Sequence, residues 1–259
     1  MKKGIVYTIL FACMLPFIGC KEDVPTLFAE PDGIYFSASS DSVSYTFAKY
    51  PNRTKDTLRL PVTVLGKPAG TNRTITVEKV TANDVNGVEG VHYKLLGPYT
   101  MSANKVSTTI PVVIYRTPDM DSLTITFVLQ LKANESFQSG ISSKTSLKIK
   151  VGYLQKPPTW GEYISTQWWA GYRDNFGTWT KTKYKLILDA LYDPVSDTTV
   201  TEFPYGALGV PPTSYPQYRQ IVKNYIRTNY PGNYPPYVGA SLKDPDQNNN
   251  PIQVGPANY

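Results

Sequence analysis

The chain has 259 residues, a formal net charge of +6, two cysteines and one histidine. Without residues 1–19, which we interpret below as a signal peptide, 24 basic residues stand against 20 acidic ones, and no basic cluster concentrates the excess, which excludes a charge-driven nucleic-acid-binding protein. The single cysteine and single histidine that remain cannot build a Cys/His zinc site or an intrachain disulfide.

The first residues, MKKGIVYTILFACMLPFIGC, predict a bacterial lipoprotein signal peptide over residues 1–19. Lys2 and Lys3 precede an apolar run that is too short to span a bilayer but suits the core of a secretory signal. The small residue before Cys20 resembles a lipobox, which implies cleavage before this cysteine and acylation of its thiol and new amine. Several acyl chains give stable anchoring. We therefore predict a lipidated tether over residues 20–33 and attachment to the outer membrane.

Two further features resemble Bacteroidota envelope proteins. Lys21-Glu22-Asp23 is similar to the export tag that sends lipoproteins of this phylum to the cell surface, so we expect the protein to face the exterior. Four tripeptides that begin with Asp and continue with Ser or Thr resemble the O-glycosylation sequon of the same phylum. The candidate glycosylation sites are Ser42, Thr57, Ser122 and Thr198.

Residues 34–151 alternate between apolar and polar side chains in short runs separated by Gly, Pro, Asn and Asp. The runs cover Leu58–Val64, Thr74–Val80, Thr108–Tyr115, Leu123–Leu131 and Ser146–Val151. This period of two predicts an antiparallel, immunoglobulin-like β-sandwich. Pro61 and Pro111 interrupt two of the runs, which predicts edge strands or bulges there.

The order of these runs, with Gly87–Tyr93 after the second and Asp119-Met120-Asp121 before the fourth, resembles a Calx-beta module. That family often binds calcium through clustered acids, but here the middle loop offers only Asp119 and Asp121, so we predict no metal site. His92 has neither a cysteine nor a second histidine as a partner, and we expect it to bond the backbone at a strand entry.

The composition changes at Lys156-Pro157-Pro158, which predicts a linker over residues 152–159 and a small aromatic- and Pro-rich α+β domain over 160–259. A helix is predicted from Ser214 through Ile226. Lys181–Tyr192 fits a helix or a strand, with the helix favoured. The segment after Asp244 resembles the start of an EF-hand loop but lacks the bidentate glutamate, so a hairpin turn is expected.

All four tryptophans and 12 of the 20 tyrosines follow this boundary. Exposed, they would form a platform for sugar rings or peptides; buried, they would form the core of an irregular domain. The candidate ligand-binding residues are Trp160, Trp168, Trp169, Tyr172, Trp179, Tyr230, Tyr234 and Tyr237.

Sequence motifs of nucleophilic, phosphate-binding, dinucleotide-binding and zinc-dependent enzymes are absent, so we expect neither catalysis nor a cofactor. A hydrolase built on two carboxylates would need no such motif and stays open as an alternative.

Together these features are similar to a family of Bacteroidota lipoproteins of unassigned function that are commonly encoded beside SusC/SusD-type importers. The closest local resemblance lies in Val64–Ala69 and Val88–Tyr93. It implies an accessory lipoprotein that binds an oligosaccharide, an oligopeptide or the importer itself, with a TonB-dependent barrel and a SusD-like lipoprotein as partners. The alternative is a structural or adhesive surface module without a small ligand.

Overall fold

In a computed structural model of the protein, the described residues are 32–81, 84–157, 160, 175–201 and 214–255. From Asp32 onward they belong to a single compact unit. Cys20, Trp168, Trp169 and Tyr172 lie outside the described residues, as do the signal peptide and the export tag. The lipid anchor and the linker at residues 152–159 stay predictions.

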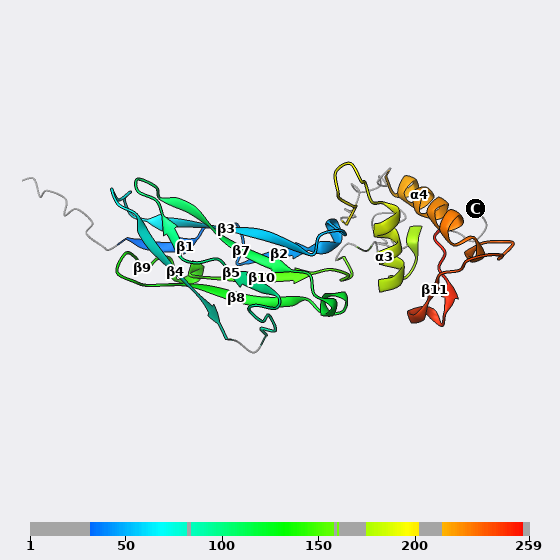
Figure 1. Ribbon diagram of the computed structural model, residues 1–259, viewed down its shortest axis with the longest axis horizontal. Helices are drawn as coiled ribbons and strands as arrows, with labels where there is room; N and C mark the ends of the chain where they lie inside the picture. Colours follow the sequence, from blue (N-terminus) through cyan, green and yellow to red (C-terminus); the bar gives the residue numbers. More distant parts are fainter. Residues whose placement is uncertain (1–31, 82–83, 158–159, 161–174, 202–213, 256–259) are drawn as a thin grey trace, which may run out of the picture. The chain divides into compact units, whose positions relative to one another are not determined.

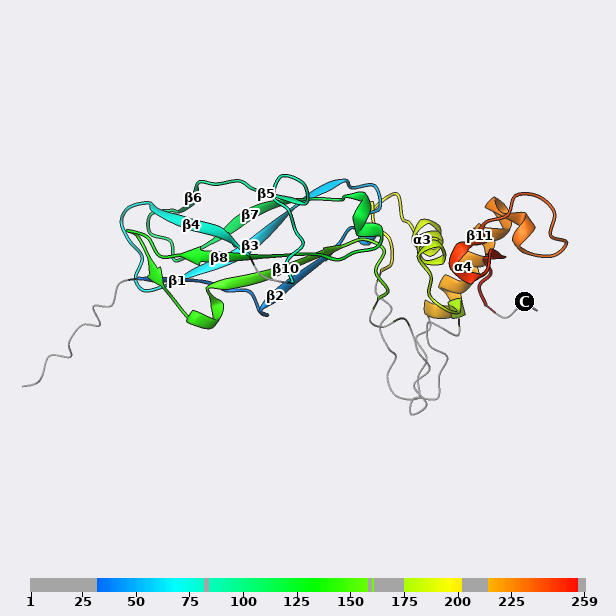
Figure 2. The ribbon, with the colours of Figure 1, turned by 90° about the horizontal axis from the view of Figure 1, so that it is seen from below.

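Ten strands form two five-stranded sheets, with the orders β5-β7-β3-β1-β9 and β2-β10-β8-β4-β6 (Figures 1 and 2). The strands are β1 Gly33–Phe36, β2 Ser42–Thr46, β3 Lys55–Leu65, β4 Arg73–Val80, β5 Tyr93–Leu95, β6 Tyr99–Met101, β7 Ser107–Tyr115, β8 Ile125–Lys132, β9 Gln138–Ser139 and β10 Ser146–Gly152. All five predicted runs are strands, and the mostly-β sandwich is confirmed.

The alternation places one face of each strand in a core between the sheets. In β8 every second side chain from Ile125 to Leu131 is buried, and the intervening ones are partly exposed. The Tyr93 ring of one sheet stacks on Phe127 of the other, with centroids 3.9 Å apart and planes 9° from parallel. The sheets are therefore joined directly through aromatic side chains.

The prediction of edge strands or bulges at the two prolines is wrong, because both strands lie inside the sheet and pair with each other in continuous register. Pro61 lies in β3 and Pro111 in β7, and both strands are interior. Each proline instead lies just beyond the end of a shorter neighbour, because β1 stops at Phe36, paired with Val62, and β5 stops at Leu95. A missing N–H therefore costs no ladder hydrogen bond at either position.

The C-terminal part contains helices α3 (Lys181–Ala190) and α4 (Ser214–Asn229), which pack against each other. The Thr180 hydroxyl caps α3 by accepting from the Lys183 N–H at 3.2 Å, which explains why the ambiguous segment is helical. No helix within the described residues is long and apolar enough to cross a bilayer.

The EF-hand-like segment forms the predicted hairpin, with β11 (Lys243–Asp244) antiparallel to β12 (Asn250–Pro251). Asp244 is buried, and its carboxylate accepts from the Thr180 hydroxyl at 2.5 Å and from the Asp246 N–H at 3.1 Å. These oxygens therefore serve the fold.

The buried hydroxyls of Tyr99 and Tyr93 differ in hydrogen bonding, so removing each should change the free energy of unfolding differently. The Tyr99 hydroxyl donates to the Pro111 carbonyl and accepts from the Leu96 N–H, whereas the Tyr93 hydroxyl has no hydrogen-bond partner among the described residues. Tyr99→Phe is therefore expected to lower the free energy of unfolding by about 1–2 kcal/mol, and Tyr93→Phe to leave it unchanged or raise it. Urea unfolding at pH 7 measures both variants.

Tyr93 also predicts how the stability of the protein changes at alkaline pH. Burial, with a contribution from Glu89, raises the pKa of Tyr93 to about 12. The unfolded state loses this proton near pH 10 and the folded state does not, so stability falls from about pH 10 upward. Tyr93→Phe should show a smaller loss of stability between pH 9 and 11; an identical loss would contradict this cause.

Candidate functional site

A groove with a volume of about 480 Å³ lies along one edge of the second sheet. Its described lining comes from β2, the residue before β8, the end of β10, the segment that follows β10, α3 and the loop that follows α3. The lining residues are Ser44, Tyr45, Thr46, Thr124, Lys150, Gly152, Gln155, Lys156, Pro157, Tyr184 and Thr201. Segments far apart in sequence therefore form a single site.

One sheet edge forms part of the groove, because β2 pairs in parallel with β10 and places Ser44 opposite Lys150. Both side chains are exposed, as alternation along each strand requires. The next segment is held in place by Gln155, whose amide nitrogen donates to the carbonyls of Met120 and Leu123 at 2.9 and 3.0 Å. The groove thus rests on fixed elements.

Tyr45 is positioned by neighbours outside the groove. Its hydroxyl donates to the Asp56 carboxylate at 2.6 Å, and its ring stacks on Tyr50, which carries the Arg53 guanidinium 4.0 Å from its centroid. Burial and then the bond to Asp56 raise the pKa of Tyr45. Partial burial opposes ionisation of Asp56, but hydrogen bonds from Tyr45, the Thr57 N–H and Arg53 hold its pKa below the usual value.

A polar network fixes the loop before Thr201 to the turn that follows Tyr45. The Asn52 amide donates to the Tyr192 hydroxyl at 2.7 Å and to Asp197 at 3.2 Å, and the Tyr192 hydroxyl also donates to Asp197. The Thr199 N–H donates to the Lys49 carbonyl at 3.0 Å. These bonds hold the segment that supplies Thr201 beside the sandwich.

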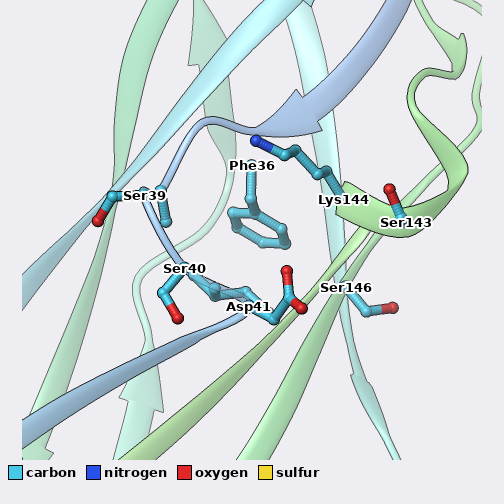
Figure 3. Close-up of a pocket in the computed structure, with 9 residues that line it drawn as sticks. Phe36, Ser39, Ser40, Asp41, Ser143, Lys144 and Ser146 are labelled. Carbon is cyan, nitrogen blue, oxygen red and sulfur yellow. The ribbon is translucent and has the colours of Figure 1, made fainter.

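A second hollow, shown in Figure 3, is too small for an organic ligand. Its volume of about 30 Å³ suits roughly one water molecule. The Phe36 ring lies between the side chains of Lys144 and Asp41 in this view, with serines around the rim. We therefore place no ligand there.

The predicted aromatic residues divide between core and surface. Trp160 and Tyr234 are buried, which agrees with core packing, one of the two alternatives that the sequence left open. The Trp160 indole donates to the Gly177 carbonyl at 3.0 Å, and the Tyr234 hydroxyl donates to the Val254 carbonyl and accepts from the Val254 N–H. Trp179 and Tyr230 are half-buried against the core, and Tyr237 is 60% exposed. None of these residues lines the described part of the groove.

The four candidate glycosylation sites all lie within the described residues. Thr57 and Ser122 are exposed, and Ser42 and Thr198 are half-buried. The Ser122 hydroxyl accepts from Lys181 at 2.8 Å, and the Thr198 hydroxyl lies 2.8 Å from that of Ser196. Glycosylation at these positions stays a prediction.

His92 bonds the backbone as expected, because its Nδ1 accepts from the Val88 N–H at 2.9 Å. Its Nε2 lies 3.0 Å from the Asp119 carboxylate, a contact that the sequence did not indicate. One of the two acids considered for calcium is thus engaged by a histidine. Among the described residues no group of three or more His, Cys, Asp or Glu side chains could hold a metal ion.

The fold and the groove define an immunoglobulin-like β-sandwich protein with a groove of mixed polar and apolar lining beside its second sheet. The chain belongs to the family described as Domain of unknown function (DUF4843), whose model matches residues 28–192. The match covers the sandwich, α3 and every described groove residue except Thr201. No curated protein sequence matches the chain.

Several solved structures are similar at low identity. A candidate carbohydrate-binding protein from Bacteroides ovatus is 12% identical over 46% of this chain and 36% of its own, with a TM-score of 0.35. A two-domain protein of unknown function from Bacteroides fragilis is 12% identical over 52% of this chain and 53% of its own, with a TM-score of 0.37. The Calx CBD2 domain is 13% identical over 48% of this chain and 87% of its own, with a TM-score of 0.32. The matched region thus spans 36% and 53% of the two Bacteroides chains.

Proposed function

We propose that this protein is a non-catalytic lipoprotein on the outer face of the outer membrane, which binds an oligosaccharide or oligopeptide as an accessory component of a SusC/SusD-type importer. The groove is the observation that carries the proposal. Its volume of about 480 Å³ falls within the range of roughly 300–1,000 Å³ common for ligand sites. Hydroxyl, amide, ammonium and tyrosine groups line it, as sugars and peptides require. The predicted signal peptide, the lipobox-like sequence at Cys20 and the predicted acidic tether support the location.

Filling the groove tests ligand binding. Ser44→Trp should weaken binding of any glycan or peptide found on an array by about tenfold or more, because an indole would occupy the lining of the groove. Thr100→Trp on β6 is the matched control, since it also adds an indole at an exposed strand position but lies outside the groove lining. Equal binding by both variants would rule out the groove as the site.

The importer component of the proposal has its own test. A C-terminal tag leaves Cys20 free for acylation, and the protein can then be purified from gently solubilised outer membranes. Co-purification of a TonB-dependent barrel and a SusD-like lipoprotein, identified by mass spectrometry, is the expected result. A protein that purifies without partners would overturn membership of a stable importer complex.

The burial of Trp160 and Tyr234 favours a second candidate, a structural or adhesive surface module. With these rings in the core, fewer aromatic faces remain for a ligand than the sequence indicated. This candidate predicts adhesion to a protein or matrix that survives Ser44→Trp, whereas the binding proposal predicts loss of ligand with the same variant.

A further inference from the structure

We infer that helix α4 carries a binding site for a phosphate or sulfate group, formed by Arg219, Lys223 and Arg227. The site goes beyond the proposed function, because no residue of α4 belongs to the described lining of the groove. The three basic residues are spaced four apart, which places them on one face of the helix. The helix contains no aspartate or glutamate, so no acid within α4 offsets their charge.

Lys223 is the centre of this row and is unusual in its surroundings. Its relative exposure is only 3%, although lysines are almost never fully buried unless they are paired. Within the part of the chain that the structure describes, its ammonium group has neither an ion pair nor a hydrogen bond. Its Nζ instead lies 5.6 Å from the centroid of the Tyr234 ring.

The other buried cations of the described residues show what Lys223 lacks. The Nη1 of Arg73 lies 2.6 Å from the Asp32 carboxylate, and the Nζ of Lys183 donates to the Thr178 carbonyl at 3.1 Å. A buried charge without a partner costs free energy. An anion bound at Lys223 would supply the missing partner and recover part of that cost.

The neighbours of Lys223 add positive charge. The Arg227 guanidinium lies 5.4 Å from the centroid of the same Tyr234 ring, and Arg219 donates from its Nη1 to Oδ1 of Asn175 at 3.2 Å, a neutral acceptor. Desolvation, followed by the charges of Arg227 and Arg219, lowers the pKa of Lys223. Mutual repulsion of three cations creates a positive potential that attracts an anion.

The geometry favours a tetrahedral oxyanion over a carboxylate. The three side chains start from successive turns of α4, so their N–H donors approach a common anion from different directions. Phosphate and sulfate present oxygens in several directions, whereas a carboxylate presents two oxygens in one plane. Arginine also binds two oxygens of such an anion at once. Arg227 is exposed, so the row is open to solvent at this end.

The test titrates sodium phosphate and sodium sulfate into the full-length protein in detergent at constant ionic strength and measures binding by calorimetry. Lys223→Met should weaken the affinity for phosphate about tenfold or more, because it removes the central charge while keeping an apolar stem beside Tyr234. Arg227→Gln should also weaken it, and this exposed position carries no risk to the core. Lys185→Met on α3 is the matched control, since its ammonium is already paired with Asp189, and it should leave the affinity unchanged.

A thermal-unfolding measurement gives a second readout. Phosphate should raise the unfolding temperature of the wild type in proportion to its binding, whereas sodium chloride at equal ionic strength should not. Lys223→Met should lose this response while remaining folded without phosphate, because it removes an unpaired buried charge. Glucose 6-phosphate forms a further arm: tighter binding than inorganic phosphate supports a phosphorylated sugar as the carrier, and equal binding supports the free anion.

The contrary outcomes are specific. No binding of phosphate or sulfate, or equal phosphate affinity in the wild type, Lys223→Met and Arg227→Gln, would overturn the site. Acetate that binds as tightly as phosphate would overturn the preference for a tetrahedral anion. Ser44→Trp should leave phosphate binding intact, so failure of this site and failure of the groove can be told apart.

Discussion

Replacing Trp160 with alanine is expected to lower the free energy of unfolding by about 3–5 kcal/mol, because the indole is buried and its removal leaves a large cavity. The ring packs edge-on against Tyr184, with centroids 5.8 Å apart. The loss also leaves the Gly177 carbonyl without the hydrogen bond that the indole now donates. Urea unfolding followed by circular dichroism measures the effect without relying on tryptophan fluorescence.

Tyr237→Ala is the control for this prediction. Tyr237 is 60% exposed, so its truncation should change the free energy of unfolding by less than about 0.5 kcal/mol. The two variants therefore separate a core aromatic from a surface aromatic within one candidate set. If Trp160→Ala kept native stability but lost ligand binding, the packing role would be contradicted and a role of Trp160 in an aromatic binding surface would be supported.

Tyr234 shows why burial of an aromatic residue could not be predicted from the local sequence. Tyr234 stands in a Pro-rich stretch typical of an exposed extended segment, yet it is buried because its hydroxyl bonds both the N–H and the carbonyl of Val254. That partner lies beyond a hairpin, and no local pattern announces it. Local sequence predicts the extended backbone of this segment, but the hydrogen bonds to Val254 determine that the Tyr234 ring is buried.

The sandwich was easier to predict, because alternation is a local property of each strand. The five predicted runs match β3, β4, β7, β8 and β10 to within a few residues. β2 was missed, since Ser-Val-Ser-Tyr-Thr is short and mostly polar and gains its strand character only by pairing with β10. Half of the sandwich could thus be read locally, while sheet edges depend on partners far along the chain.

The groove was missed for the same reason. Its lining includes Tyr45 from β2, Lys150 from β10 and Tyr184 from α3, none of which belongs to a recognisable motif. The sequence analysis directed attention to the Trp- and Tyr-rich C-terminal half, and none of its candidate aromatic residues that the structure describes lines the groove. The exposed lysine in an alternating strand was the one local signal of an open polar face.

Asp32→Asn is expected to lower the free energy of unfolding by about 3–5 kcal/mol, an effect usually too large for a residue whose side chain is 30% exposed. The reason is Arg73, whose side chain is 9% exposed and whose Nη1 lies 2.6 Å from the Asp32 carboxylate. Its Nε and Nη2 are buried without hydrogen-bond partners in the described structure, and its guanidinium lies 4.6 Å from the Phe137 ring centroid. Removing the carboxylate leaves this buried charge uncompensated.

The double variant Asp32→Asn/Arg73→Met separates this cause from a simple loss of contacts. Methionine can keep much of the packing on Phe137 and removes the charge, so the double variant should regain most of the lost stability. Asp189→Asn is the exposed counterpart, since it breaks the pair with Lys185 on the surface of α3 and should cost less than about 1 kcal/mol. If the double variant were no more stable than Asp32→Asn alone, the buried guanidinium would not be the source of the lost stability. Asp32 would then act through the hydrogen bond that its carboxylate accepts from the Lys67 N–H.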